Sequence, residues 1–253
     1  SGIALIAAIV LVVVTGTNPA HLVQAIHFPT VILLFSLMIV SARFAAAGFY
    51  DMCAAWIARQ SGSPIRLLAL TVGVTGGLSA VLVNDVVVFV MTPLLCAGLA
   101  VRKLDPRPFL AGVAGASNAG SAATLIGNPQ NIVIGQVGGL EFSKFLFVCG
   151  VPAAVSLLAV FLTVATVWRR RLAQAPAPAE GLPTVKLDRP ETTKATLATL
   201  VLLVLFVTPV AREMSALLVA AVLLMSGTRV WCLMSMLWLK RETPPIVTVH
   251  VLT

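Results

Sequence analysis

Charged residues are scarce in this chain, and their scarcity excludes most classes of soluble protein. Only 10% of its 253 residues are Asp, Glu, Lys or Arg, whereas 59% are hydrophobic, and the mean hydropathy is +1.02. Ordinary soluble domains contain about 25% charged residues. Because the apolar residues form long uninterrupted segments, the composition predicts an all-α polytopic membrane protein.

Cysteine and histidine are also rare, and their positions do not suggest metal or redox chemistry. The histidines, at positions 21, 27 and 250, lie outside the clear apolar segments. The four cysteines are far apart and form no CxxC pair: Cys53, Cys96, Cys149 and Cys232. Neither a zinc site nor a disulfide framework is indicated. An intramembrane hydrolase would need a nucleophile beside an embedded base, so we expect neither enzyme activity nor a cofactor.

The charge that is present is mostly basic, with a net value of +8, and it lies between apolar segments. Arg102 and Lys103 follow one such segment and Arg169-Arg170-Arg171 follow another, whereas the only Lys or Arg in the connections on the other side is Lys144. Basic loops face the cytoplasm. We therefore predict a multi-pass protein of the inner or plasma membrane, with Arg102 and Arg169 inside and Lys144 outside. Topology explains the basic residues better than nucleic-acid binding does.

One uncharged run is too long for a single straight membrane helix. Residues 108–140 contain no Lys, Arg, Asp, Glu or His, whereas a straight span needs about 20 residues. Gly127-Asn128-Pro129 predicts a break, because Gly permits unusual dihedrals and Pro lacks an amide donor. Backbone groups freed by a break persist in a bilayer only where protein, water or an ion satisfies them. The break is therefore a candidate ion or substrate site; a packing face with a proline kink is the alternative.

A second stretch, residues 65–100, carries a carboxylate inside apolar sequence. Asn84 and Asp85 separate two apolar arms, and Asp85 is the only acidic residue between Asp51 and Asp105. A carboxylate at mid-bilayer costs roughly 2.5 kcal/mol or more, so its presence is typical of an ion, proton or counter-charge site. The lengths fit either a re-entrant hairpin with Asn84-Asp85 at its tip or two short spans. The position of Asp85 favours the hairpin.

The rest of the chain can be divided by composition. Arg43 lies near the end of its apolar segment, within reach of the interface, and residues 49–60 predict an amphipathic interfacial helix. The expected units are a first repeat (residues 1–171), a cytoplasmic Pro/Ala-rich linker (residues 172–195) and the start of a second repeat (residues 196–226). The last unit is an atypical tail (residues 227–253) like that of a truncated or frame-shifted product.

Two motifs in this order resemble a known group of transporters. Residues 78–93 read Leu-Ser-Ala-Val-Leu-Val-Asn-Asp-Val-Val-Val-Phe-Val-Met-Thr-Pro, and residues 117–135 read Ser-Asn-Ala-Gly-Ser-Ala-Ala-Thr-Leu-Ile-Gly-Asn-Pro-Gln-Asn-Ile-Val-Ile-Gly. Together they resemble the N-terminal half of the ion transporter superfamily, which includes citrate-transporter-like permeases, divalent anion–sodium symporters, arsenite permeases and sodium–proton antiporters. The resemblance implies the N-terminal repeat of an inverted-repeat transporter, in which a re-entrant hairpin and a broken transmembrane helix form half of a midplane site.

The resemblance also implies the residues of that site. The positions at the hairpin tip are Val83, Asn84 and Asp85, and those around the break are Ser117, Asn118, Thr124, Gly127, Asn128, Pro129 and Asn131. Sodium would be held by hard oxygen ligands from Asn84, Asp85, Gly127 and Asn128. This chain reads Val-Asn-Asp where sodium-coupled carboxylate transporters carry Ser-Asn-Thr. The acidic tip is more like the arsenite and sodium–proton branches.

The expected function is ion-coupled secondary transport of a small anion by alternating access, with sodium or a proton as the coupling ion. A sodium–proton antiporter and an arsenite-type efflux permease are alternatives, and a channel or structural membrane subunit is an alternative of another class. The expected partners are the lipid bilayer and a small anionic substrate, with a homodimer left open and no nucleic acid. No second hairpin and break are present, so we expect that residues 1–253 alone do not transport.

Overall fold

The computed structural model describes residues 6–7, 10–12, 14, 26–60, 62–174, 176–178, 185–208 and 210–226. These residues are helical or irregular and include no strand. Five of the helices are long and apolar enough to cross a membrane. The all-α polytopic membrane fold is therefore confirmed, whereas the inverted repeat stays a prediction. The tail 227–253, His21 and half of the short apolar segment 3–14 lie outside the described residues.

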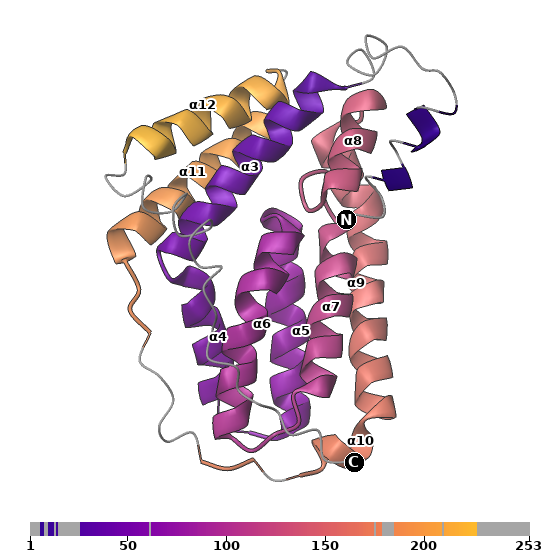
Figure 1. Cartoon of the computed structure of the whole chain (residues 1–253), viewed down its shortest axis with the longest axis vertical. Helices are drawn as coiled ribbons and strands as arrows, with labels where there is room; N and C mark the ends of the chain where they lie inside the picture. Colours follow the sequence, from indigo (N-terminus) through magenta and orange to yellow (C-terminus); the bar gives the residue numbers. More distant parts are fainter. Residues whose placement is uncertain are drawn as a thin grey trace.

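A bundle of four helices that run side by side forms the centre of the molecule (Figure 1). They are α5 (Pro64–Val81), α6 (Asn84–Val101), α7 (Arg107–Ser121) and α9 (Phe142–Val167). α5 and α7 rise from the end of the bundle that carries Arg102, and α6 and α9 return to it. We call this end the basic end. Lys144 and Arg169 flank the two ends of α9, as the predicted topology requires.

The contact between α5 and α7 is closest where two glycines meet. A Cβ atom built on Gly120 would lie 2.1 Å from the carbonyl oxygen of Gly76. Lower in the same contact, a Cβ on Gly112 would lie 3.0 Å from Leu68. Because backbone atoms cannot move aside as a side chain can, Gly120 is needed for this approach. Small residues of this kind are typical of helix contacts in membranes, where they allow backbones to pack closely.

A second group of helices packs across the other end of the bundle (Figure 1). It consists of α3 (Phe28–Ala46), α11 (Arg189–Val207) and α12 (Arg212–Met225). Arg43 is buried between them, donates a hydrogen bond to the carbonyl oxygen of Leu223 and lies 3.5 Å from the carboxylate of Glu191. Two protein acceptors thus hold the Arg43 guanidinium, while its Nε has no partner among the described residues; that Arg43 reaches the interface stays a prediction.

The segments on either side of the linker differ from the expected boundaries. The short helix α10 (Arg169–Leu172) follows α9, and α11 begins at Arg189, inside the expected linker 172–195. The early start has a local cause, because the Asp188 carboxylate accepts the Glu191 N–H and Pro190 suits the first turn. The described linker residues are also docked, since Ala177 N–H donates to Arg102 O and Asp188 N–H donates to Ala47 O, both at 3.0 Å.

Helix α4 (Phe49–Arg59) is the helix expected over residues 49–60, and it packs against the side of the bundle; that it lies at the membrane interface stays a prediction. It packs along α6 and buries Tyr50, Ala54 and Ile57. Gly48 precedes it with a φ of 75°, a conformation that favours glycine, and a Cβ there would lie 2.6 Å from the carbonyl oxygen of Lys186. The turn between α3 and α4 therefore fits against the end of the linker.

Candidate functional site

The turn between α5 and α6 is the predicted hairpin tip, and its backbone is held by two other parts of the chain. Val83 and Asn84 are buried, with 3% and 7% of their surfaces exposed. The N–H of Val83 donates to Ser41 Oγ on α3 at 3.1 Å, and the N–H of Asn84 donates to the carbonyl oxygen of Gly127 at 3.1 Å. The tip is thus bonded to the predicted break.

The predicted break separates α7 from α8 (Pro129–Val137), and it is longer than the sequence suggested. α7 ends at Ser121, and α8 starts after Asn128, which caps it by accepting the Asn131 N–H at 2.8 Å. The intervening residues fold back closely, because a Cβ on Gly127 would lie 2.3 Å from the carbonyl oxygen of Ser121. Gly127 therefore permits the close fold, and Pro129 occupies the first turn of α8.

Three polar side chains of the break satisfy backbone or hydroxyl groups within the protein. The amide of Asn131 donates to the carbonyl oxygens of Ser121 and Thr124, at 3.2 and 2.8 Å. Asn128 Nδ2 donates to Ser121 Oγ at 3.1 Å, and Thr124 Oγ1 donates to the carbonyl oxygen of Ala80 at 2.6 Å. These residues therefore stabilise the break and tie it to the end of α5.

Asn84 is different, because its side-chain oxygen has no such partner. Asn84 Oδ1 is buried and accepts no hydrogen bond from the described residues. The nearby carbonyl oxygen of Gly127 accepts one hydrogen bond, from Asn84 N–H, and a carbonyl can accept two. Leaving a buried amide oxygen unsatisfied costs about 1–3 kcal/mol. This oxygen is therefore a candidate ligand for a cation, and the Gly127 carbonyl is a second one.

The remaining predicted site residues lie around this contact without meeting at one point. Asp85 is exposed in the first turn of α6, where the helix dipole favours a carboxylate. Asn118 is exposed on α7, and its amide donates to Ala114 O of its own helix at 3.0 Å. Ser117 is buried, one turn before Ser121. Tip and break thus come together, whereas Asp85 and Asn118 face outward.

Two further hydroxyl groups beside the tip were not among the predicted residues. Thr75 Oγ1 and Ser79 Oγ on α5 are buried and have no hydrogen-bond partner among the described residues. Thr71, one turn earlier, instead donates to its own helix at Leu67 O. The spacing of four residues places all three on one face of α5. This repeated hydroxyl spacing was the sequence signal that could have revealed them.

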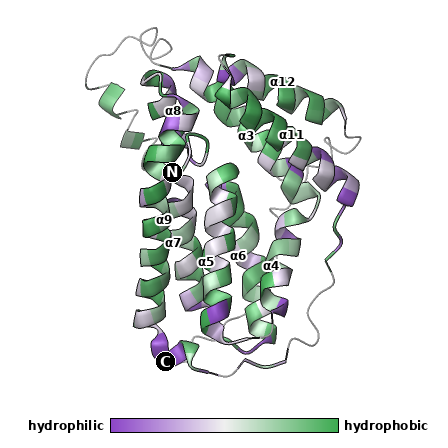
Figure 2. Ribbon diagram, turned by 180° about the vertical axis from the view of Figure 1, so that it is seen from behind, coloured by the Kyte–Doolittle hydropathy of each residue, from purple (hydrophilic) through white to green (hydrophobic). Residues whose placement is uncertain are grey.

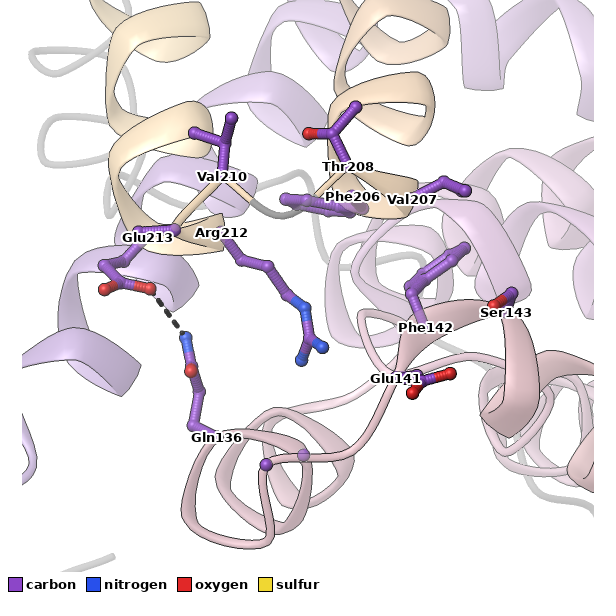
Figure 3. Close-up of a pocket in the computed structure, with 13 residues that line it drawn as sticks. Gln136, Glu141, Phe142, Ser143, Phe206, Val207, Thr208, Val210, Arg212 and Glu213 are labelled. Atoms are coloured by element: carbon purple, nitrogen blue, oxygen red, sulfur yellow. Dashed lines mark hydrogen bonds between the residues drawn. The ribbon is translucent and has the colours of Figure 1, made fainter.

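A cavity of about 540 Å³ lies far from the basic end, between the α8–α9 connection and the α11–α12 turn (Figure 3). Gln136 Nε2 donates to Glu213 Oε2 across it at 3.2 Å, and Arg212 extends into it and donates to Leu140 O. Asn84 and Gly127 do not line it. The cavity joins the end of α8 to α11 and α12 and is separate from the contact of tip and break.

Comparison with known proteins assigns the chain to a family. A family profile described as "Citrate transporter" matches residues 1–240. The chain belongs to the citrate transporter family. The predicted resemblance to the ion transporter superfamily is thereby confirmed, and with the apolar helices it makes the chain a multi-pass integral membrane protein.

Relatives of this chain occur in bacteria and eukaryotes. It is 38% identical over 125 residues to a 46 kDa membrane protein of Mycobacterium leprae, and that alignment covers 48% of the chain. It is 34% identical over 176 residues, or 66% of the chain, to the human P protein. It is 30% identical over 145 residues, or 57% of the chain, to a transporter of Dictyostelium discoideum named arsB. The alignments cover 28%, 21% and 26% of those relatives, so the chain matches about a quarter of their length.

Proposed function

We propose that this chain supplies one half of the transport site of an ion-coupled secondary transporter of a small anion. The observation that carries the proposal is the hydrogen bond from Asn84 N–H to Gly127 O, at 3.1 Å, next to the buried and unpartnered Asn84 Oδ1. An amide oxygen and a backbone carbonyl are hard ligands of the kind that alkali and alkaline-earth cations take. Broken helices that meet near the membrane midplane are the usual place for such ligands in secondary transporters.

The proposed coupling ion is sodium, held by Asn84 Oδ1 and the carbonyl oxygen of Gly127. Asp85, which is exposed, and Asn128, whose Oδ1 accepts the Asn131 N–H, would add a further oxygen only after turning toward the ion. Ser79 Oγ is an additional candidate, because it is buried without a partner on the arm that leads to the tip. Helices α6 and α8 both begin at this contact. Helix N-termini attract negative groups, which supports an anionic substrate beside the cation.

A sodium–proton antiporter or an arsenite-type efflux permease is the second candidate, and one residue favours it. Asp85 stands at the tip in the first turn of α6, and an acidic residue at the tip is the feature that the sequence shares with these branches. The relative named arsB supports the same branch. Asp85→Asn retains the side-chain size and one carbonyl acceptor but loses the charge. If protons are the coupling ion, this change abolishes the pH dependence of ligand binding, whereas Glu141→Gln, at the exposed start of α9, does not.

Thermal unfolding of residues 1–253 in lipid nanodiscs tests the proposal. A ligand that binds the folded state raises its stability according to its concentration and affinity. We expect sodium chloride to stabilise the protein more than choline chloride at equal ionic strength. Citrate, succinate, sulfate or arsenite should add to this stabilisation only when sodium is present. An anion that stabilises equally in choline, or no specific ion effect at any pH, would contradict the proposal.

Transport by the isolated chain is expected to fail, because the inverted-repeat plan needs a second hairpin and break. Liposomes containing residues 1–253 should therefore take up no more citrate, succinate, sulfate or arsenite than empty liposomes under a sodium or proton gradient. Gradient-driven uptake would instead show that this chain is a working unit. Cysteine labelling from each side tests the topology. Arg102 is buried, so its exposed neighbour Lys103 is used in its place: positions 103 and 169 should react from the cytoplasmic side and position 144 from the other.

A further inference from the structure

Helix α9 presents an apolar face that the rest of the described chain does not cover. In its most hydrophobic stretch only 6% of residues are buried. Phe147, Val151 and Val155 expose 80%, 68% and 62% of their surfaces. Figure 2 shows α9 as hydrophobic along most of its length and α10, which follows it, as hydrophilic. In a membrane protein, such a face lies against lipid acyl chains.

Three consecutive arginines follow the lipid-facing helix, and they are not equivalent. Arg171 forms an ion pair with Asp105 in the connection between α6 and α7. Arg169 and Arg170 are exposed, and within the described ranges neither side chain has a hydrogen bond or an ion pair. Trp168, which is partly buried, separates them from the last turn of α9. An aromatic residue followed by basic residues is typical of the membrane–water interface.

Asp105 fixes the geometry of this cluster but does not neutralise it. Burial raises the pKa of the Asp105 carboxyl. The hydrogen bonds and charges of Arg107 and Arg171 lower it by more, so the pKa is lowered overall. The carboxylate therefore stays charged and holds Arg171. Its single negative charge interacts with Arg107 and Arg171, and Arg169 and Arg170 directly precede Arg171 in the chain. Four arginines and one carboxylate leave three positive charges uncompensated. An anion is the complement of such a cluster.

We propose that Arg169 and Arg170 bind the headgroup phosphate of an anionic phospholipid whose acyl chains lie along the exposed face of α9. Guanidinium groups match phosphate oxygens in shape as well as charge. The adjoining apolar face provides the place for acyl chains, which a free phosphate ion would not need. The site lies at the basic end of the bundle, away from the tip and break, and does not depend on the proposed transport function.

Native mass spectrometry of residues 1–253, titrated with phosphatidylglycerol or phosphatidylcholine, tests this site. Each surface arginine near an anionic leaflet contributes about 1 kcal/mol, so Arg169→Gln or Arg170→Gln should weaken phosphatidylglycerol binding roughly fivefold and the double variant roughly thirtyfold. Arg169→Lys with Arg170→Lys keeps both charges but loses the planar guanidinium groups, so this variant should bind more tightly than the double Gln variant and less tightly than the parent chain. Lys144→Gln, which removes one exposed charge at the other end of α9, serves as the control and should bind as the parent chain does.

Three outcomes would overturn the proposal. The first is a double Gln variant that retains the parent preference for phosphatidylglycerol, and the second is a Lys144→Gln variant that weakens binding as strongly as Arg170→Gln. The third is glycerol 3-phosphate, added without acyl chains, binding as tightly as the lipid, since this would indicate a free-phosphate site. Salt should weaken the preference, because these arginines are exposed and their interactions are screened. Thermal unfolding of each variant confirms that the fold is retained.

Discussion

Helices α5 and α9 belong to the same bundle but differ in how hydrophobic and how buried they are. α5 is the less hydrophobic of the two, with a mean hydropathy of 1.5 in its most apolar stretch, yet 44% of that stretch is buried. α9 has a mean hydropathy of 2.5, and only 6% of the corresponding stretch is buried. Helix α5 meets α7 at Gly76 and carries buried hydroxyl groups at Thr75 and Ser79.

This difference shows where hydrophobicity acts in a membrane protein. Lipid tails are as apolar as leucine, so an apolar side chain gains little by leaving lipid for the protein interior. The interior instead contains small and polar residues whose close contacts and hydrogen bonds cannot be replaced by lipid. The less hydrophobic helix, α5, is therefore the one that leads to the turn with α6, where the candidate site lies. The apolar helix serves as the lipid-facing wall.

Adding one methyl group at the contact of α7 with α5, and one on α9, should give the largest contrast. Gly120→Ala places a Cβ 2.1 Å from the backbone oxygen of Gly76, so α5 and α7 must separate. We expect a loss of about 3 kcal/mol of unfolding free energy or more. At Gly150 on α9 the nearest atom, in Leu146, is 3.9 Å away, and Ala should gain up to about 1 kcal/mol in helix propensity. Denaturant unfolding in micelles measures both, and similar losses would contradict the assigned packing.

A smaller effect is expected from the side chain that holds the break. Asn131→Ala removes the donors to the carbonyl oxygens of Ser121 and Thr124. Leaving these oxygens without partners should cost about 2 kcal/mol. The exposed neighbour Gln130 is the control, and Gln130→Ala should change stability by less than about 0.5 kcal/mol. If both variants unfold at the same denaturant concentration, Asn131 does not hold the break.

The smallest effect is expected at the basic end. Asp105→Asn removes the ion pair with Arg171, whose side chain is 46% exposed, so the cost at neutral pH should be below about 1 kcal/mol. The pKa of Asp105 is lowered in the folded state. Its stabilisation is therefore present above the unfolded-state pKa and is lost as the pH falls through the folded-state pKa. Parent and variant should converge in stability at acid pH, and a difference that grows on acidification would contradict this assignment.

The turn at Asn84 and the break before Pro129 could be predicted from the sequence because their signals are local, whereas the re-entrant course of α5 and α6 stays a prediction, since each is long enough to cross a membrane. Asn84 and Asp85 interrupt apolar arms whose ends agree closely with α5 and α6, and Pro129 starts α8. Contacts that depend on distant segments could not be predicted in this way. Ser41 reaches Val83 N–H from α3, and nothing in the sequence around Ser41 indicates this partner.

The extent of the break and the division of its residues also needed the structure. α7 ends at Ser121 because the chain folds back and Asn131 caps the freed carbonyls. The sequence treated all the Asn, Ser and Thr side chains of this region as equal candidates. Their hydrogen bonds separate Asn128 and Asn131, which hold the break, from Asn84, whose Oδ1 has no partner among the described residues. Asn118 bonds to its own helix, a role that composition cannot distinguish from a ligand.

The most direct test of the central claim compares two asparagines in the sodium dependence of thermal unfolding. Asn84→Ala removes the buried unpartnered oxygen, whereas Asn118→Ala removes an exposed amide that bonds to Ala114 O. At about one hundred times its dissociation constant, sodium should stabilise the parent chain by about 2.7 kcal/mol relative to choline. The account predicts the same increment for Asn118→Ala and none for Asn84→Ala. A full sodium increment in Asn84→Ala would contradict the assignment of the tip and break as the cation site.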